Sequence, residues 1–317
     1  MRALFLLTVL LFALPAHAFQ ITQITHTSTH DFEAGVSGSN VVWRGGEGGN
    51  EEIYFYDGVT TTLVPGSSTR NVEPDISGST VVWRGLDGND YEVYLWDGTT
   101  TTQITDNENF DAFPAISGSN VAWADLTLDE IFLWDGSNIT QISDGTGYSD
   151  YPDISGANVV WRENDSDIYL WDGATTIQLP DMGLNEGQPA ISGSNVVWEA
   201  NDGGHSEIYF WDGVSVTQIT HNDTHDFLPD ISGSNVVWSS WDGNDYEVYL
   251  WDGTTTTQIT ENSANDLHVA ISGDTVVWSG EEDGNREIYM TTIPEPSTAL
   301  LLAAGLAGLA AAGRRRA

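Results

Sequence analysis

The sequence predicts an all-β fold, a seven-bladed β-propeller with four antiparallel strands in each blade, from three observations. First, seven tryptophans recur every 37 to 40 residues and close similar S-G-x-x-V-V-W segments: Trp43, Trp83, Trp123, Trp161, Trp198, Trp238 and Trp278. Second, turn residues divide each repeat into four short β-type segments. Third, one of these segments is apolar on both faces, so each sheet needs a neighbour on both sides. Four-stranded sheets repeated in this way form a closed propeller.

The repeat that ends at Thr260 shows how each element arises. Its predicted strands span residues 229–232, 235–238, 246–251 and 254–260. Gly233 turns the first strand into the second, Asp242–Asp245 forms a tight turn before the third, and Asp252-Gly253 is a two-residue hairpin turn. These hairpin turns favour antiparallel pairing over a parallel β-helix, the alternative for stacked strands. The fourth strand is rich in Thr and Gln, which predicts an exposed edge. The recurring tryptophans and tyrosines are interpreted mainly as core between blades, rather than as a surface for stacking sugars.

The two ends of the repeat array predict how the ring closes. The last repeat has a third strand at residues 287–290, but no fourth strand follows it before Pro294. Residues 20–25, QITQIT, match the fourth-strand pattern and precede the first repeat without a partner. We therefore expect the N-terminal strand to complete the last blade and remove two exposed sheet edges.

The first 18 residues are typical of an export signal. An apolar run from Ala3 to Pro15 follows Met1-Arg2, and Ala16 and Ala18 form a small-x-small cleavage pattern around His17. The run is too short for an ordinary membrane span. A mature chain that starts at Phe19 is therefore expected, with the propeller at residues 19–293. A buried N-terminal strand is the alternative interpretation.

The composition excludes several classes of partner and site. Without the predicted terminal signals the chain carries 46 acidic residues, five arginines and no lysine, a charge near -41. Such a surface repels nucleic acid and anionic lipid, whereas it attracts divalent cations or a basic partner. Cysteine is also absent, which excludes disulfides, thiol catalysis and zinc-thiolate sites.

The repeat resembles that of TolB-type propellers from Phe19 to about Met290. The shared pattern is a strand ending in Ile-Thr, then Pro-x-Ile-Ser-Gly, an apolar strand, Asp-Gly-Asn and Glu-Ile-Tyr. The chain departs from the family in having Ser-Gly-Ser-Asn where Ser-Pro-Asp-Gly is usual. The family includes periplasmic binding modules and the propeller parts of peptidases, so the resemblance implies a binding scaffold with the Pro-x-Ile-Ser strand innermost.

The C-terminal segment, residues 294–317, resembles a PEP-CTERM sorting signal. Pro294, Glu295 and Pro296 precede an apolar run at residues 298–313, and Arg314, Arg315 and Arg316 follow it. The arginines would hold the end of an apolar helix in the cytoplasm, giving a transient insertion in the inner membrane. The resemblance implies processing by an exosortase in a Gram-negative bacterium that makes extracellular polysaccharide. A permanent tail anchor is the alternative.

One column of polar residues is a candidate cation site. It lies three residues before the Pro of each repeat or its equivalent: Asp31, Asn71, Asp111, Ser149, Glu186, Asp226 and Asp266. If the Pro-x-Ile-Ser strand is innermost, the five acids of this column are expected to ring one mouth of the channel and bind a cation such as Ca²⁺. The alternative is that they cap turns between blades.

Two acidic turns are weaker metal candidates. They contain Asp87 and Asp90, followed by Glu92, and Asp242 and Asp245, followed by Glu247. Oxygen ligands at this density can hold calcium, but Asp, Gly and Asn are also what a tight turn requires. Histidine pairs precede two column residues, His26 and His30 before Asp31 and His221 and His225 before Asp226, and exposed loop histidines are the favoured reading over a transition-metal site.

Two function classes remain from the sequence. The leading expectation is an exported, non-enzymatic propeller that binds a glycan, cation or protein at the cell surface or in the extracellular matrix. The alternative is a glycan hydrolase or lyase built on a propeller. No set of residues breaks the repeat symmetry in a way that convincingly predicts a catalytic site, and no cofactor is expected with the possible exception of Ca²⁺.

Overall fold

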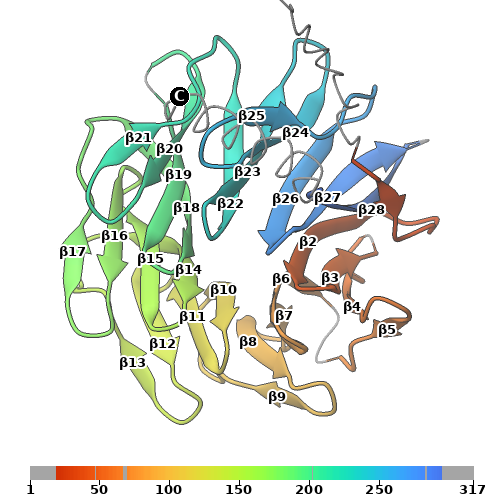
Figure 1. Cartoon of the computed structure of the whole chain (residues 1–317). Helices are drawn as coiled ribbons and strands as arrows, with labels where there is room; N and C mark the ends of the chain where they lie inside the picture. The colour runs from red at the N-terminus through yellow and green to blue at the C-terminus, as the bar shows by residue number, and fades with distance from the viewer. Residues whose placement is uncertain (1–18, 47, 67–69, 202, 283, 295–317) are drawn as a thin grey trace, which may run out of the picture. The chain divides into compact units, whose positions relative to one another are not determined.

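The structure is a computed structural model that describes residues 19–294 except 47, 67–69, 202 and 283. The predicted export signal and nearly all of the C-terminal sorting segment, including its apolar run, lie outside these residues. The described chain forms one compact unit, Ile21–Thr292. This unit contains seven four-stranded antiparallel sheets arranged in a ring (Figure 1). Within the described part, no helix is long and apolar enough to cross a bilayer.

Each blade places one strand at each of four positions, counted outward from the axis. The innermost strands are β2 (Asp31–Ser37), β6 (Asn71–Ser77), β10 (Asp111–Ser117), β14 (Ser149–Ser155), β18 (Asn185–Ser192), β22 (Asp226–Ser232) and β26 (Asp266–Ser272). The second strands are β3 (Asn40–Gly45), β7 (Thr80–Leu86), β11 (Asn120–Asp125), β15 (Asn158–Glu163), β19 (Asn195–Asn201), β23 (Asn235–Trp241) and β27 (Thr275–Glu282). The third strands are β4 (Glu52–Tyr56), β8 (Tyr91–Trp96), β12 (Glu130–Trp134), β16 (Asp167–Trp171), β20 (Ser206–Trp211), β24 (Tyr246–Trp251) and β28 (Asn285–Thr292). The outermost strands are β5 (Thr61–Leu63), β9 (Thr101–Gln103), β13 (Ile139–Gln141), β17 (Thr176–Gln178), β21 (Val216–Gln218), β25 (Thr256–Gln258) and β1 (Thr22–Gln23).

The predicted fold class and the predicted closure are both confirmed. The N-terminal strand β1 pairs with β28 in the last blade, with Thr22 opposite Met290 and Gln23 opposite Tyr289. Strand β1 has two residues instead of the predicted six, and the outermost strands of the other blades have three. Strand β25 is wholly exposed, as expected of an edge, and its three residues pair with β24.

The recurring tryptophans form the core between blades, as predicted. Trp83 is fully buried and stacks on Tyr94 of the neighbouring strand, with ring centroids 5.8 Å apart. The same pairing recurs around the ring because the register places each tryptophan opposite an aromatic residue of the third strand. Aromatic stacking and apolar burial therefore stabilise every blade in the same way.

A belt of hydrogen bonds joins neighbouring blades at the end of the innermost strands. The Ser that ends each innermost strand accepts a hydrogen bond from the backbone N–H of the Gly that follows the innermost strand of the next blade. The donor–acceptor pairs are Gly78–Ser37, Gly118–Ser77, Gly156–Ser117, Gly193–Ser155, Gly233–Ser192, Gly273–Ser232 and Gly38–Ser272, at 2.8 to 3.1 Å. The belt is complete, so the repeated Ser-Gly dipeptide fixes the innermost strands around the axis.

Candidate functional site

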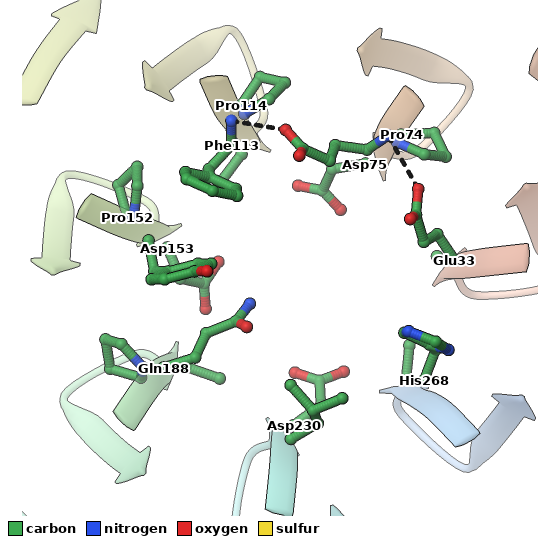
Figure 2. A pocket seen from close by; sticks show the side chains of 18 of the residues that line it. Glu33, Pro74, Asp75, Phe113, Pro114, Pro152, Asp153, Gln188, Asp230 and His268 are labelled. Atoms are coloured by element: carbon green, nitrogen blue, oxygen red, sulfur yellow. Dashed lines mark hydrogen bonds between the residues drawn. The ribbon is translucent and has the colours of Figure 1, made fainter. Parts of the chain in front are cut away.

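The innermost strands surround a cavity of about 290 Å³ on the axis of the propeller. All seven innermost strands contribute to its wall, and Figure 2 shows the side chains of Asp75, Gln188 and Asp230 facing the open centre. One residue from each blade projects from the same level of the wall. These seven residues, here termed the bulge ring, are Glu33, Glu73, Phe113, Tyr151, Gln188, Leu228 and His268.

The bulge ring arises from an irregularity in strand pairing. In every blade the register between the innermost and second strands shifts by one residue, for example between Phe32 and Gly35. The ring residue has a left-handed backbone in six blades, with φ between 48° and 54° at Glu33, Glu73, Phe113, Tyr151, Leu228 and His268. A non-glycine residue in this region costs about 1–3 kcal/mol, and such residues concentrate at functional sites. A bulge also redirects a side chain, here toward the channel.

The bulge ring differs from the rest of the repeat in that its residue type changes around the ring: two glutamates and two aromatic residues lie in neighbouring blades, and Gln188, Leu228 and His268 occupy the other three. This asymmetric ring was not singled out from the sequence, because a bulge is invisible in the strand pattern. The expectation that no set of residues forms a catalytic site stays a prediction. The signal was nevertheless present: the residue before the repeat Pro, or its equivalent in the first and last repeats, varies among six residue types, while the Trp and Ser columns are the same in all seven repeats.

The two glutamates of the ring connect three blades. Glu33 Oε2 accepts the backbone N–H of Glu73 at 3.0 Å, and Glu73 Oε2 accepts that of Phe113 at 2.8 Å (Figure 2). Their other oxygens pair with Arg44 at 3.1 Å and Arg84 at 2.8 Å. Burial raises the pKa of Glu73 even though Arg84 opposes the shift. These contacts hold both carboxyl groups rigidly in the channel wall.

Among the described ring residues, His268 alone has a buried side-chain polar atom without a hydrogen-bond partner. Its Nδ1 atom is buried and has no hydrogen-bond partner. Burial lowers the pKa of the imidazole, while the nearby Glu33 carboxylate acts in the opposite direction. His268 is therefore neutral near pH 7 and can donate or accept one hydrogen bond from a ligand.

The opposite side of the ring is aromatic. The Phe113 and Tyr151 rings lie 4.2 Å apart between their centroids. The Arg84 guanidinium lies 5.9 Å from the Phe113 ring and that of Arg162 lies 4.9 Å from the Tyr151 ring. Arg162 is held by a two-point contact with Asp150, at 2.9 and 2.6 Å. Cation–π contacts at these distances fix the orientation of the rings that face the cavity.

A second layer of the cavity wall alternates between acidic and small residues. The residue after the Pro, or its equivalent, is in blade order Gly35, Asp75, Ala115, Asp153, Ala190, Asp230 and Ala270. Each aspartate accepts the backbone N–H of the residue that follows it and that of the equivalent Ile in the next blade. For Asp153 these distances are 2.8 Å from Ile154 and 2.6 Å from Ile191.

These three aspartates have the largest pKa changes in the channel. Burial is the main cause in each case, and it raises the pKa of Asp75 to about 6, of Asp230 to about 7 and of Asp153 to about 8. Asp230 and Asp75 add to the shift of Asp153 by charge repulsion. The charge of the channel wall therefore changes between about pH 6 and pH 8, as these aspartates gain or lose protons.

The predicted acidic column does not line the channel. Its members, Asp31, Asn71, Asp111, Ser149, Glu186, Asp226 and Asp266, are at most 3% exposed, and none is among the described residues that line the cavity. The bulge adds one residue between positions 31 and 35, so these two positions face opposite sides of β2 instead of the same side. The expectation that the column rings the channel mouth was therefore wrong, and cation binding by its acids stays a prediction.

The column residues instead connect the loops to the blade core. The Trp123 indole N–H donates to Asp111 Oδ1 at 3.0 Å, and the Asn107 side-chain amide donates to Asp111 Oδ2 at 3.2 Å. Asp226 makes the equivalent bonds with Trp238 and Asn222. Burial raises the pKa of Asp31 to about 6, and that of Asp111, Glu186 and Asp266 to about 7. This arrangement matches the alternative interpretation, in which the column caps turns.

The histidine pairs serve the loops in a similar way. His30 Nδ1 accepts the backbone N–H of Arg286 at 3.1 Å, and His225 Nδ1 accepts that of Ser206 at 3.3 Å. Across residues 19–294, apart from the omitted positions, the groups of carboxylates and imidazoles close enough to share a metal ion contain neither pair. The groups that are close enough contain the acidic turn residues Asp87 and Asp90, and Asp242 and Asp245.

Comparison with known proteins identifies the C-terminal segment and the fold. Residues 292–316 match the family model of the PEP-CTERM protein-sorting motif. The match implies export through the membrane to the cell surface and processing by an exosortase. Ala16, Ala18, Glu295, Pro296 and the three C-terminal arginines lie outside the described residues, and Pro294 is the last described residue. A search of curated protein sequences found no match.

Solved structures share the propeller fold at low sequence identity. The β-propeller domain of the Trilobed protease from Pyrococcus furiosus aligns with a TM-score of 0.67 and 12% identity, over 84% of this chain and 94% of that domain. Pyrococcus horikoshii acylaminoacyl peptidase aligns with a TM-score of 0.67 and 12% identity, over 83% of this chain, which spans 51% of the peptidase. The computationally designed Ika8 protein aligns with a TM-score of 0.56 and 16% identity, over 86% of this chain and 98% of that protein. These similarities concern the fold alone.

Proposed function

We propose that the mature protein is a non-enzymatic, TolB-like propeller that binds a basic protein partner through the bulge ring, in the surface layer or extracellular matrix of a Gram-negative bacterium. The asymmetry of the bulge ring is the observation that carries this proposal. A ring used only for folding has no reason to hold six strained positions with side chains of several kinds in one cavity. The sorting motif supports display outside the cell.

The size and charge of the cavity favour one inserted basic side chain. Its volume of about 290 Å³ is near the lower end for ligand pockets, so it suits a single side chain rather than a long ligand. The channel wall carries five carboxyl groups, those of Glu33, Glu73 and the three channel aspartates. Arg44 and Arg84 pair with the two glutamates, so the carboxyl groups outnumber the guanidinium groups by three. The aromatic side provides a face on which a planar guanidinium can stack.

Calorimetric titration of the purified propeller tests this function. N-acetyl-arginine amide should bind, and N-acetyl-citrulline amide, which has nearly the same shape but no charge, should bind at least ten-fold more weakly. Tyr151→Ala and Asp153→Ala should weaken binding of the arginine probe. Two control variants should not: Tyr56→Ala changes a position in the third strand of a blade, and Asp274→Asn changes an exposed turn. Equal binding of the two probes, or no effect of the channel variants, would reject this ligand class.

A glycan hydrolase or lyase is the second candidate, favoured by His268. A neutral, buried imidazole with a free nitrogen beside a carboxylate can act as a general base. Incubation with acidic and neutral bacterial polysaccharides, followed by assays for new reducing ends and for unsaturated sugar products, tests this activity. Turnover that disappears in His268→Ala, with an unchanged melting temperature, would favour the enzyme over the binding protein.

A further inference from the structure

Two turns that do not line the channel gather carboxylates that are not paired with arginines. The β7–β8 turn brings together Asp87, Asp90 and Glu92, and the β23–β24 turn brings together Asp242, Asp245 and Glu247. In each group one carboxylate oxygen from every residue lies within 4.8 Å of the others. In the described part of the chain, none of the six acids forms a salt bridge with an arginine.

The first aspartate of each turn is only partly used by the turn itself. Asp242 Oδ1 accepts the backbone N–H groups of Asn244 and Asp245, at 2.8 and 3.2 Å. The Asp242 backbone N–H closes the turn on the Asp245 carbonyl at 3.1 Å, and Gly243 supplies the required positive φ of 108°. The turn is therefore complete with one oxygen of Asp242, and its Oδ2 atom remains open to a ligand.

The second aspartate has an oxygen that the fold does not satisfy. Asp245 is only 5% exposed, and its Oδ1 atom is buried without a hydrogen-bond partner. The corresponding Oδ1 atom of Asp90 is also buried and unpaired. A buried carboxylate oxygen without a donor costs free energy unless a cation or water occupies its lone pairs.

The glutamate of each group is fully buried beneath this aspartate. Glu247 Oε1 accepts the backbone N–H of Asn262 at 2.7 Å, and Glu92 Oε1 accepts that of Asn107 at 2.8 Å. The other oxygen of each glutamate, Oε2, is buried without a hydrogen-bond partner. Close carboxylates repel one another, and a cation would relieve this repulsion.

The sister blades show which of these acids the fold requires. Glu287 of the last blade occupies the position of Glu247, and its carboxylate accepts bonds from Thr25 and Thr27. At the position of Asp245, however, the last blade has Asn285. The buried glutamate thus serves the last blade without a second carboxylate at the position of Asp245, so the fold does not require that aspartate. This difference separates a structural role from a ligand-binding role.

We propose that each of these two turns binds one calcium ion, which places one site in the second blade and one in the sixth. The donors are oxygen atoms only, and carboxylates from a flexible turn with water as the remaining ligands suit Ca²⁺ better than the strict octahedron of Mg²⁺. Three protein carboxylates and an open outer side resemble extracellular calcium sites, for which dissociation constants are roughly 10⁻⁴ to 10⁻³ M. Export to a calcium-containing medium would fill such sites.

The stoichiometry of binding tests the proposal. Calorimetric titration of the propeller with CaCl₂ should give two sites, Asp90→Asn and Asp245→Asn should each leave one, and the double variant should leave none. The Asp274→Asn control removes the same charge from an exposed turn and should keep two. Two remaining sites in the double variant, or no saturable binding to the unchanged protein, would overturn the proposal.

Two further measurements separate specific sites from general attraction to an acidic surface. Tb³⁺ luminescence excited through Tyr91 and Tyr246 should be strong in the unchanged protein, should be lost in the double variant, and should be displaced by Ca²⁺. Millimolar CaCl₂ should raise the melting temperature more than NaCl of the same ionic strength, which only screens repulsion. Equal effects of the two salts would show that calcium acts by screening, against the proposed sites.

Discussion

The backbone N–H of Gly38 donates a hydrogen bond of 3.1 Å to Ser272 Oγ, although the two residues are 234 positions apart in the chain. This bond is the chemical equal of the six other Ser-Gly bonds of the belt, but it joins the first blade to the last. Chain entropy makes it different, because the other bonds connect blades that are already consecutive in the sequence.

Replacing Ser272 by Ala should therefore disturb the closed ring more than replacing Ser117 by Ala, which removes the equivalent bond between consecutive blades. Each variant should lose about 1 kcal/mol of unfolding free energy, the usual value of one hydrogen bond. The unfolding rate should rise more in Ser272→Ala, since opening between the first and last blades starts at this seam. Stopped-flow unfolding in guanidinium compares the two, and identical unfolding rates would contradict a special role for the seam.

Deletion of residues 20–25 should destabilise the propeller by several kcal/mol. It removes β1, whose backbone pairs with β28, and also Thr25, whose hydroxyl accepts the Ile288 N–H at 2.9 Å. Differential scanning calorimetry measures the change. Thr25→Ala should show a smaller part of the same loss, and an unchanged melting temperature in the deletion variant would show that the N-terminal strand does not close the ring.

The stability of the propeller should be greatest in mildly acidic solution. Asp75, Asp153 and Asp230 have folded-state pKa values of about 6, 8 and 7, above the ordinary value for Asp. The folded chain therefore holds more protons than the unfolded chain between about pH 4 and pH 8, so stability falls as the pH rises through this window.

Acid should destabilise the protein only at lower pH. The hairpin aspartate Asp252 has its pKa lowered to about 2 by hydrogen bonds from Thr254 and Thr255, and this stabilisation is lost as the pH falls below about 4. Thermal melting between pH 3 and 9 at constant ionic strength tests both effects, the loss of stability above mildly acidic pH and the loss below about pH 4. Replacement of all three channel aspartates by Ala, the residue that three of the other four blades already carry, should reduce the loss of stability near neutral pH. It should not abolish this loss, because the buried column acids also have raised pKa values, and Asp274→Ala should leave the loss unchanged.

Replacing Glu295 by Ala, or Arg314, Arg315 and Arg316 by Gln, should block processing and leave the propeller folded. The sorting motif lies outside the repeat, so its loss should change the location of the protein and not its melting temperature. Immunoblots of membrane and extracellular fractions provide the readout. Equal amounts of mature protein outside the cell for the variants and the unchanged chain would contradict the proposed route.

Much of the architecture was predictable from the printed sequence. The Trp period, the Asp-Gly hairpins and the two-sided apolar third strand predicted seven four-stranded blades, because these features depend on contacts within one repeat or between adjacent repeats. The closure was predictable for a similar reason: residues 20–25 match a strand that the last repeat lacks. The acidic turn groups were also visible, since their ligand residues are close in sequence.

The channel was decided by the tertiary structure. The sequence placed Asp31 and Asp226 at its mouth, yet the bulge turns them into the blade and brings Glu33 and Leu228 to the channel instead. A strand pattern with period two assumes uninterrupted pairing. One extra residue moves the side chains that precede the bulge to the opposite face of the sheet. Whether a strand contains a bulge depends on how it pairs with its neighbours. The sequence by itself therefore determined the ring, and the pairing of its strands decided which side chains the ring presents to a ligand.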